Sequence, residues 1–217
     1  MKDNKKSALI LGASGLVGSE VLSLSLESDL YNKIVIVVRS PLTIKHNKLV
    51  EKIIDFDMPK WEEIFPVDHV YCCLGTTIKQ AGSKTNFIKV DHDYPLAFAA
   101  AAKKWESSIF SIITAAGVSP ESKIFYNNVK GQLEKKLKSL ELFSTLIFRP
   151  SLLLGERKEF RLGEKIGSGI AKVTSWMTPK TYRAIHCKAV AKAMLTESFA
   201  DKTGFNIISN KSMHRFS

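Results

Sequence analysis

The sequence predicts an α/β fold, a Rossmann-like, doubly wound parallel sheet with a small C-terminal substrate lobe. A glycine-rich turn, Gly12-Ala-Ser-Gly15-Leu-Val-Gly18, follows an apolar run at residues 8–11. Residues 33–38 contain the uninterrupted β-branched run Ile-Val-Ile-Val-Val, which is typical of a strand buried on both faces. Strand and helix signals alternate over the rest of the chain, and such alternation indicates parallel strands joined by helical crossovers.

Short apolar runs that end at glycine, proline or charged residues mark the strands of this sheet. The first two are the run before the glycine turn and the β-branched run. A shorter candidate, Ile53-Ile-Asp-Phe56, comes next, and Val70-Tyr-Cys-Cys-Leu74 then ends at Gly75. The remaining strands are expected at residues 109–114, 145–148 and 205–209.

Helical patterns lie between these strands. The first helix opens at about Gly15, because apolar residues recur from Leu16 at roughly helical spacing. Residues 95–105 are rich in alanine and have Pro95 in the first turn, where a helix tolerates proline. Further helices are expected within the lysine-rich residues 123–140, and at residues 162–176 and 186–198.

The length of 217 residues suits a single domain, residues 1–217, and 45% of the residues are hydrophobic. Residues 155–183 are the least regular segment and follow the sixth expected strand, so we expect them to form the substrate lobe. No apolar run reaches the roughly 20 residues that span a bilayer. The charged start of the chain shows no signal-peptide pattern.

The three cysteines, Cys72, Cys73 and Cys187, form neither a disulfide framework nor a spacing typical of metal ligands. We therefore expect no metal site, and a protein of the reducing cytoplasm. Cys72 and Cys73 alternate across a strand, so one is expected to face the core and the other a helix.

The net charge of +11 is compatible with a nucleic-acid or membrane-surface partner. The lysines are scattered along the chain, however, mostly beside helical patterns. No aromatic residues interleave with them, as they do in surfaces that bind single strands. A solvated lysine-rich surface with a general attraction for phosphorylated ligands is therefore favoured, and no nucleic-acid partner is expected.

The glycine turn predicts a diphosphate-binding site. A diphosphate rests on the N–H groups of a helix N-terminus only where no Cβ stands in the way, and the third glycine lets the helix pack against the strand. The candidate binding residues are Gly12, Ser14, Gly15, Leu16, Val17 and Gly18. The alternative is a strand–turn–helix that binds nothing, since this spacing also occurs by chance.

Arg39 follows the second strand, where a fold that prefers NAD usually has an acidic residue for the ribose 2′-hydroxyl. An arginine, helped by Ser40, pairs instead with a 2′-phosphate. These residues predict NADP(H) as the cofactor, and the alternative is an arginine that stacks on adenine or points to solvent. Asp55, at the end of the third expected strand, either contacts the adenine edge or caps a turn.

Tyr126 and Lys130 lie four residues apart in the lysine-rich helix, so they share one face. An ammonium group favours the tyrosinate form of a neighbouring phenol, which makes Tyr126 a candidate proton donor to a carbonyl. Lys130 is also a candidate ligand of a ribose hydroxyl. Thr114 ends the fifth strand and is a candidate to polarise the same substrate oxygen. The alternatives are an exposed pair and a threonine without such a role.

Two histidines lie close to strand or helix signals. His69 precedes the fourth expected strand, and His92 lies in Val90-Asp-His-Asp-Tyr94. Histidines in such places are more often surface or capping residues than catalysts, so neither is expected to carry the chemistry.

The glycine turn together with Tyr126-x-x-x-Lys130 resembles the short-chain dehydrogenase/reductases of the extended or atypical kind. Longer strings are similar to those of the oxidoreductases related to human HIV Tat-interactive protein, a small NADPH-binding group. These strings are Cys72-Cys-Leu-Gly-Thr-Thr77, Ala81-Gly82, Phe87-x-x-Val-Asp-x-Asp-Tyr94, Val129-Lys-Gly131, Phe148-Arg-Pro150 and Glu156-Arg-x-Glu-x-Arg-x-Gly-Glu164. The resemblance extends over about residues 8–195.

The resemblance implies a Rossmann-like fold with NADPH bound in the glycine turn, and it makes Tyr126 and Lys130 the catalytic pair. The residues that it implies to lie near the cofactor are Leu74, Gly75 and Thr76, with Pro150 beside the nicotinamide. The chain departs from the group at the end of the fifth strand, where Thr114-Ala115 replaces Ser-Ser. The β-branch of threonine restricts its side-chain rotation, so cofactor binding is better supported than catalysis.

Two hypotheses for the function follow. The leading one is an NADPH-dependent reductase of a small carbonyl compound, in which Tyr126 donates the proton. The other is an NADPH-binding sensor that acts through a protein partner with little or no catalysis, since the serine is missing. The sequence leaves the substrate and the oligomeric state open.

Overall fold

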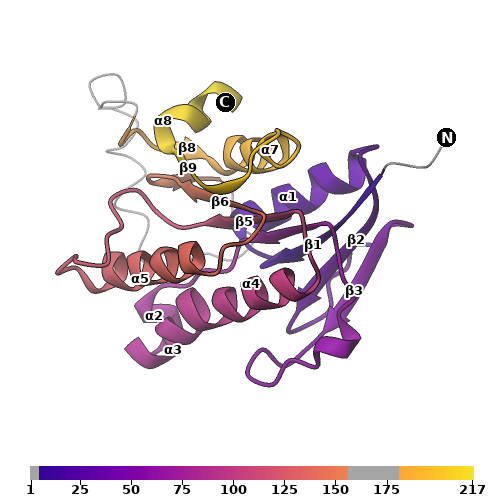
Figure 1. Ribbon diagram of the computed structural model, residues 1–217, viewed down its shortest axis with the longest axis horizontal. Helices are drawn as coiled ribbons and strands as arrows, with labels where there is room; N and C mark the ends of the chain where they lie inside the picture. Colours follow the sequence, from indigo (N-terminus) through magenta and orange to yellow (C-terminus); the bar gives the residue numbers. More distant parts are fainter. Residues whose placement is uncertain (1–4, 156–180) are drawn as a thin grey trace.

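A computed structural model describes residues 5–155 and 181–217, and these form three layers, with a parallel sheet between two sets of helices (Figure 1). Helices α1 (Leu16–Glu27) and α7 (Cys187–Ser198) cover one face. Helices α4 (Tyr94–Lys104) and α5 (Phe125–Ser139) cover the other, with the short α2 (Ile78–Ala81) and α3 (Lys84–Ile88) at the same side. The expected Rossmann-like, doubly wound sheet is therefore confirmed. The helix expected at residues 162–176, and most of the lobe expected at 155–183, lie outside the described residues.

Seven parallel strands form the sheet, in the order β3-β2-β1-β4-β5-β6-β9. The strands are β1 (Lys6–Leu11), β2 (Tyr31–Val38), β3 (Leu49–Ile53), β4 (His69–Cys72), β5 (Ile109–Ile113), β6 (Ser144–Arg149) and β9 (Gly204–Ser209). A separate pair joins β7 (Leu153–Leu154) to β8 (Ile185–His186). The strand order reverses between β1 and β4, so the turns that follow these two strands meet at one point of the carboxyl edge.

The helices lie close to where the sequence predicts them. This holds for α1 (Leu16–Glu27), α4 (Tyr94–Lys104), α5 (Phe125–Ser139) and α7 (Cys187–Ser198). The short α8 (Asn210–Met213), near the C-terminus, was not predicted. The segment between β4 and α4 is more structured than expected: it contains α2 (Ile78–Ala81), α3 (Lys84–Ile88) and the π-helical segment η2 (Lys89–Asp93). Its short turns carry no 3.6-residue repeat long enough to be recognised in the sequence.

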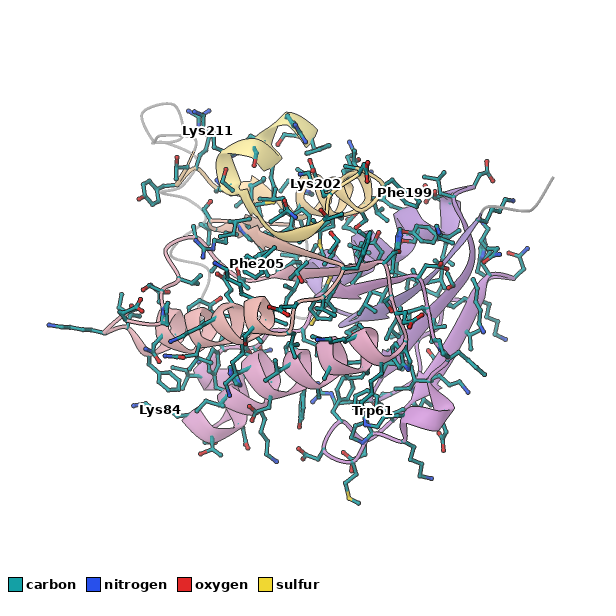
Figure 2. The ribbon with its side chains drawn as sticks, viewed as in Figure 1. Trp61, Lys84, Phe199, Lys202, Phe205 and Lys211 are labelled. Atoms are coloured by element: carbon teal, nitrogen blue, oxygen red, sulfur yellow. The ribbon has the colours of Figure 1, made fainter. Side chains whose placement is uncertain are left out.

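A hydrophobic core lies on each face of the sheet. One core packs α1 and α7 against the sheet and includes Val21 and Val190, and the other packs α4 and α5 through Phe98 and Leu133. Trp61, labelled in Figure 2, packs its ring on Phe98 with 5.0 Å between ring centroids. Strands that are buried from both sides need apolar residues at successive positions, which explains the continuous β-branched run of β2.

The third strand departs from the prediction. It spans Leu49–Ile53, in register with Ile34–Val38 of β2, whereas residues 53–56 were expected to form it. The Ile54 N–H still donates to the Val38 carbonyl, but the carboxylate of Asp55 then accepts the N–H of Asp57 at 2.9 Å. This side-chain bond closes a turn, so Asp55 lies two residues beyond the strand.

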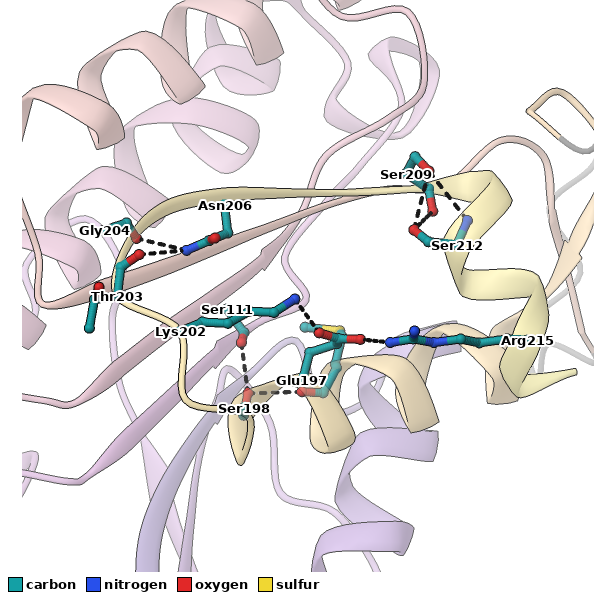
Figure 3. Close-up of polar contacts among 11 residues, drawn as sticks. Ser111, Glu197, Ser198, Lys202, Thr203, Gly204, Asn206, Ser209, Ser212 and Arg215 are labelled. Atoms are coloured by element: carbon teal, nitrogen blue, oxygen red, sulfur yellow. Dashed lines mark hydrogen bonds and ion pairs between the residues drawn. The ribbon is translucent and has the colours of Figure 1, made fainter.

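The C-terminal segment is fastened to the sheet by polar contacts (Figure 3). Glu197 of α7 is buried and forms ion pairs with Lys202 and Arg215, one on each side. The hydroxyl groups of Ser198 and Ser111 lie 3.0 Å apart, which links α7 to β5. These bonds hold the connection into β9, the last strand of the sheet.

The two adjacent cysteines face opposite sides of β4, as predicted. Cys72 is fully buried in the core beneath α4 and α5. Cys73 is partly buried and packs against the core on the other face. The alternation of side chains along a strand accounts for this arrangement.

The two histidines were expected to be surface or capping residues, but both side chains are buried. His69 is 2% exposed, and its Nδ1 lies 2.8 Å from the Tyr31 hydroxyl, which in turn lies 2.6 Å from the Tyr71 hydroxyl. His92 is 8% exposed, and its Nδ1 lies 2.7 Å from Asp93 Oδ1. Sequence position next to a strand did not reveal that neighbouring aromatic residues, Phe199 among them, cover His69.

His69 makes the fold sensitive to acid. Burial disfavours the imidazolium and lowers the pKa of His69 from 6.5 to about 4. The unfolded chain therefore takes up a proton before the folded protein does, so stability is complete above pH 6.5 and is lost as the pH falls towards 4. We expect a loss of up to about 3 kcal/mol in the free energy of unfolding across this range, at 1.36 kcal/mol per unit.

Urea unfolding at pH 7.5, 5.5 and 4.5 measures this loss. The variant His69→Gln keeps an acceptor for Tyr31 but cannot titrate, so its stability should vary less with pH than that of the wild type. His46→Gln, at an exposed position, serves as the matched control and should behave as the wild type. Equal pH slopes for the wild type and His69→Gln would contradict the prediction.

Candidate functional site

The glycine turn follows β1 directly and brings three chain segments into close contact. Gly12 has a φ of 75°, and a Cβ at this residue would lie 2.6 Å from the carbonyl oxygen of Cys73. A Cβ at Gly18 would lie 2.0 Å from the carbonyl oxygen of Gly12. No side chain fits at either position, because both neighbours are backbone atoms. The turn, α1 and the end of β4 therefore pack backbone against backbone.

Helix α1 begins at Leu16, with Gly15 as the N-cap residue. Glycine provides no side-chain oxygen for the first N–H groups of the helix, and the first turn contains no acidic residue. These N–H groups and the positive end of the helix dipole together suit an anionic group such as a diphosphate. Ser14 and Gly15 are exposed at this turn, while Leu16 is half-buried and Val17 is buried.

The loop after β4 lies beside this turn. The N–H of Cys73 donates to the carbonyl of Leu11 at 2.9 Å, which fixes the start of the loop next to the end of β1. Leu74 and Thr76 are half-buried and Gly75 is exposed. The N–H of Thr76 donates to Asp91 Oδ2 at 2.8 Å. The structure thus brings the three loop residues together with the glycine turn, and their contact with a cofactor stays a prediction.

Arg39 and Ser40 follow β2 and are both exposed. Arg39 and Asp55 both act electrostatically on Tyr94, so the three side chains lie at the same rim of the sheet. The Tyr94 hydroxyl donates to Asp57 Oδ1 at 2.7 Å. Asp55 caps the turn after β3, as one of its two interpretations expected, and as an exposed residue it remains open to a ligand as well.

Tyr126 and Lys130 both lie on α5, as predicted, but only one of them is exposed to any extent. Tyr126 is half-buried, with its ring centroid 5.7 Å from that of Phe87. The Lys130 side chain is 3% exposed, and its Nζ lies 2.8 Å from Asp91 Oδ1. Burial is the largest effect on the pKa of Lys130 and lowers it, but Asp91, Tyr126 and Cys72 together outweigh burial and hold that pKa above its usual value, with Asp91 contributing most.

Thr114 lies just beyond β5 and is 4% exposed. Its N–H donates to the Phe148 carbonyl, and its hydroxyl donates to Glu134 Oε1 at 2.6 Å. Glu134 of α5 also accepts a bond from Arg149 Nε at 3.1 Å. The hydroxyl proton of Thr114 is thus directed at Glu134, and a role for Thr114 towards a substrate stays a prediction.

Pro150 follows β6 and is buried beside this network. Its carbonyl accepts the N–H of Ala116 at 2.8 Å, which ties the turn after β6 to the turn after β5. The turns after β1, β4, β5 and β6 therefore share one edge of the sheet. This is the edge at which open α/β sheets bind their ligands.

Two buried acidic residues, Asp91 and Glu134, were missed as site residues. Asp91 lies within the string that carries the family resemblance, and Glu134 follows Lys130 by four residues, which places both on one helix face. These two features of the sequence could have identified Asp91 and Glu134 as candidates. Each is at most 5% exposed and holds a basic side chain, Lys130 and Arg149 respectively. Buried acidic residues are rare unless they are paired, which fits both cases.

A hollow of about 430 Å³ opens elsewhere, lined by the segments that precede β5 and β6, including Ser107 and Phe143. These segments lie at the amino edge, away from the glycine turn, so the hollow is separate from the candidate site. No group of residues suited to a metal ion occurs in the described part of the chain. Across residues 5–155 and 181–217, no helix has the length and apolar character needed to cross a bilayer.

Comparison with solved structures defines the class of fold. The chain is similar to the enzyme WbmH of Bordetella bronchiseptica, crystallised in complex with NAD⁺, with a TM-score of 0.69 and 18% identity. The match covers 94% of this chain and 76% of WbmH. The described structure thus shares its Rossmann-like fold with this enzyme. No protein-family model matches the chain.

Comparison with known sequences gives the family. The chain is 32% identical to Protein HTATIP2 of Rattus norvegicus over 98% of this chain and 89% of the rat protein. It is 37% identical to the mitochondrial Protein FMP52 of Eremothecium gossypii over 76% of this chain and 73% of that protein. The chain belongs to the HTATIP2 family, which confirms the resemblance seen in its motifs.

These relatives contradict the expected cytoplasmic location. Six fungal relatives of this chain are named mitochondrial. The number and spacing of cysteines indicate only whether a compartment is reducing. They therefore could not distinguish the cytoplasm from another reducing compartment.

The bond between Thr114 and Glu134 gives a prediction on stability. Thr114→Val removes the hydroxyl and leaves one oxygen of a buried carboxylate without this donor, which should cost about 1–3 kcal/mol in the free energy of unfolding. Thr114→Ser keeps the hydroxyl and should lose less. Urea unfolding at pH 7.5 measures both variants. A valine variant as stable as the wild type would show that this bond contributes nothing.

Proposed function

We propose that this protein is an NADPH-dependent oxidoreductase that reduces a small carbonyl compound. The observation that carries the proposal is the placement of Tyr126 and the glycine turn at the same edge of the sheet. The class of fold supports a nicotinamide dinucleotide, since WbmH is crystallised with NAD⁺. The turn fits such a cofactor because Gly12 and Gly18 leave no room for side chains and α1 starts without a side-chain cap.

The residues that would hold the cofactor follow from this arrangement. The turn residues Gly12, Ser14, Gly15, Leu16, Val17 and Gly18 would bind the diphosphate. Leu74, Gly75, Thr76 and Pro150 would line the nicotinamide half, and Lys130 would bind a ribose hydroxyl. Asp55 would contact the adenine edge. Each of these roles is a proposal.

Arg39 and Ser40 support NADPH over NADH. Arg39 is exposed at the end of β2 and no carboxylate ion pair engages it within the described residues. An arginine there attracts a 2′-phosphate, whereas a carboxylate would repel it.

The bound cofactor would supply the hydride for reduction of the carbonyl carbon. Tyr126 would donate its phenol proton to the carbonyl oxygen. Lys130 would stabilise the tyrosinate that remains, since an ammonium on the same helix face favours that anion. Thr114 would orient the substrate oxygen by turning its hydroxyl proton from Glu134 towards that oxygen, because a carbonyl oxygen only accepts hydrogen bonds.

One observation favours a second candidate function, an NADPH-binding sensor that acts through a protein partner. Ser-Ser, usual at the end of the fifth strand in the resembling group, is Thr114-Ala115 here, and the Thr114 hydroxyl already has Glu134 as a partner. A sensor needs the cofactor site and not the proton donor. A broad screen of carbonyl compounds, with NADPH oxidation as the readout, separates the two functions. Reproducible turnover contradicts a pure sensor.

Removal of the Tyr126 hydroxyl tests the proton donor. With a substrate from that screen, Tyr126→Phe should lower kcat about 100- to 10 000-fold, the range that general acids contribute, and leave NADPH affinity within about twofold. Tyr31→Phe, which removes a phenol hydroxyl at the amino edge of the sheet, is the control and should keep its turnover. Unchanged turnover in Tyr126→Phe would remove Tyr126 from the mechanism.

Substitution of Arg39 tests the cofactor. Arg39→Ala should weaken NADPH binding about 10- to 100-fold, the equivalent of one charged hydrogen bond, and leave NADH binding within about twofold. Fluorescence titration with both dinucleotides gives the two dissociation constants. Lys104→Ala removes an exposed charge elsewhere and controls for the general effect of net charge. A wild-type protein that prefers NADH would overturn the assignment of NADPH.

A further inference from the structure

An ion pair is buried at the centre of the candidate site. Lys130 Nζ lies 2.8 Å from Asp91 Oδ1, and the two side chains are 3% and 1% exposed. The other Asp–Lys pairs within residues 5–155 and 181–217 are much more exposed. Asp57 and Lys89, for example, are 2.9 Å apart with side chains that are 52% and 43% exposed. Desolvation makes a buried pair far more consequential than a surface pair when one partner is removed.

The second oxygen of Asp91 fixes the carboxylate in place. Asp91 Oδ2 accepts the N–H of Thr76 at 2.8 Å, in the loop that is expected to line the cofactor. Asp91 belongs to the π-helical segment η2, and such segments are frequent at functional sites. One carboxylate therefore joins the loop after β4 to the lysine of α5.

Among the residues that the structure describes, three ionisable groups act on the Lys130 ammonium. They are Asp91 on η2, Tyr126 one turn earlier on α5, and Cys72 at the end of β4. Burial raises the pKa of the Cys72 thiol to about 12, so Cys72 stays neutral at working pH. Asp91 is thus the carboxylate that balances the buried ammonium. Without it, burial would favour the neutral amine, and the pKa of Lys130 would fall.

We propose that Asp91 is a positioning residue, whose carboxylate keeps the buried Lys130 amine protonated and fixes it beside the loop that carries Thr76. An ammonium has three N–H donors, and the ion pair with Asp91 engages at most one of them, which leaves at least two for other partners. That this ammonium binds a ribose hydroxyl and stabilises the anion of Tyr126 rests on the proposed function. The charge state of Lys130 does not, and it can be measured without any cofactor.

Stability against pH tests the charge state in the protein alone. Asp91→Asn keeps an oxygen for the Thr76 N–H but leaves the buried ammonium without its counter-ion. The folded variant then releases the Lys130 proton more readily than the unfolded chain, so stability rises with pH. We expect the gap in urea midpoint between this variant and the wild type to shrink by at least half from about pH 7 to about pH 9.5.

For Lys130→Met, the gap in urea midpoint to the wild type should change with pH in the opposite direction. This substitution leaves the Asp91 carboxylate without its counter-ion, and protonation of that carboxyl relieves the cost, so the gap to the wild type should widen as the pH rises from about 5 to about 8. The double variant removes both charges, and its gap should not change with pH. The surface pair is the matched control, since the effect of Asp57→Asn should be small and independent of pH between about 7 and 9.5.

The titration of Lys130 gives a direct measurement. In protein labelled with ¹³C at lysine Cε, the Lys130 signal is assigned by its loss in Lys130→Met. In Asp91→Asn the pKa of Lys130 should fall by about 2 units or more. The proposal is overturned if Lys130 titrates alike in the wild type and in Asp91→Asn. It is equally overturned if the midpoint gap of Asp91→Asn is constant with pH, or if this variant stays unfolded up to pH 9.5 while the double variant folds.

Cofactor binding then separates this inference from the proposed function. In Asp91→Asn, the dissociation constant of NADPH should rise at least fivefold from about pH 7 to about pH 9, relative to the wild type, as Lys130 loses its proton. A wild type that binds no NADPH refutes the proposed function, while the stability series still decides the role of Asp91. NADPH binding with equal pH dependence in both proteins would show that the ammonium does not serve the cofactor.

Discussion

The close packing of backbone around Gly12 is the constraint on which the rest of the site depends. Gly12 has a positive φ and faces the Cys73 carbonyl, and Gly18 faces the Gly12 carbonyl. Any Cβ there would push α1 away from β1 or β1 away from β4. The two neighbouring strands would then no longer present their turns at one point, and the N-terminus of α1 would lose its position. Glycine at these two positions therefore allows the close backbone packing that leaves the N-terminus of α1 accessible to an anion.

Helix α5 organises the opposite side of the site through charge. Its inner face carries Lys130 and Glu134, which are paired with Asp91 and with Arg149. Both pairs reach across to other elements, one to η2 and the other to the end of β6. Buried pairs repay their desolvation only when the geometry is good and the remaining hydrogen-bonding groups are satisfied. Thr114 donates to Glu134 and Thr76 donates to Asp91 Oδ2, whereas Asp91 Oδ1 has the Lys130 ion pair but no hydrogen bond of regular geometry among the described residues. Polar groups are thus concentrated here in an otherwise apolar interior.

The family and the fold place different limits on the function. The fold is shared with solved structures of low sequence identity, such as WbmH, and a shared fold does not transfer a substrate. The relation to HTATIP2 is closer and covers nearly the whole of both chains. The chain departs from the resembling group at Thr114-Ala115 after β5. Arg39 after β2 and the buried Asp91–Lys130 pair are two further local features that bear on the cofactor and on charge. These are the positions at which experiments on cofactor choice and catalysis have the most to report.

The sequence by itself determined the order of elements, the glycine turn and the Tyr126–Lys130 spacing, because each depends on residues that are close together in the chain. Periodicity located six of the seven sheet strands to within a few residues, and it misplaced the third, whose limits depend on pairing with β2 and on the turn closed by Asp55. Only the tertiary structure decided the partners of the charged residues. Asp91 lies 39 residues from Lys130, and Glu134 lies 20 residues from Thr114, so no local pattern relates them. The same holds for His69, which is buried because Tyr31, Tyr71 and Phe199 come together around it from distant parts of the chain.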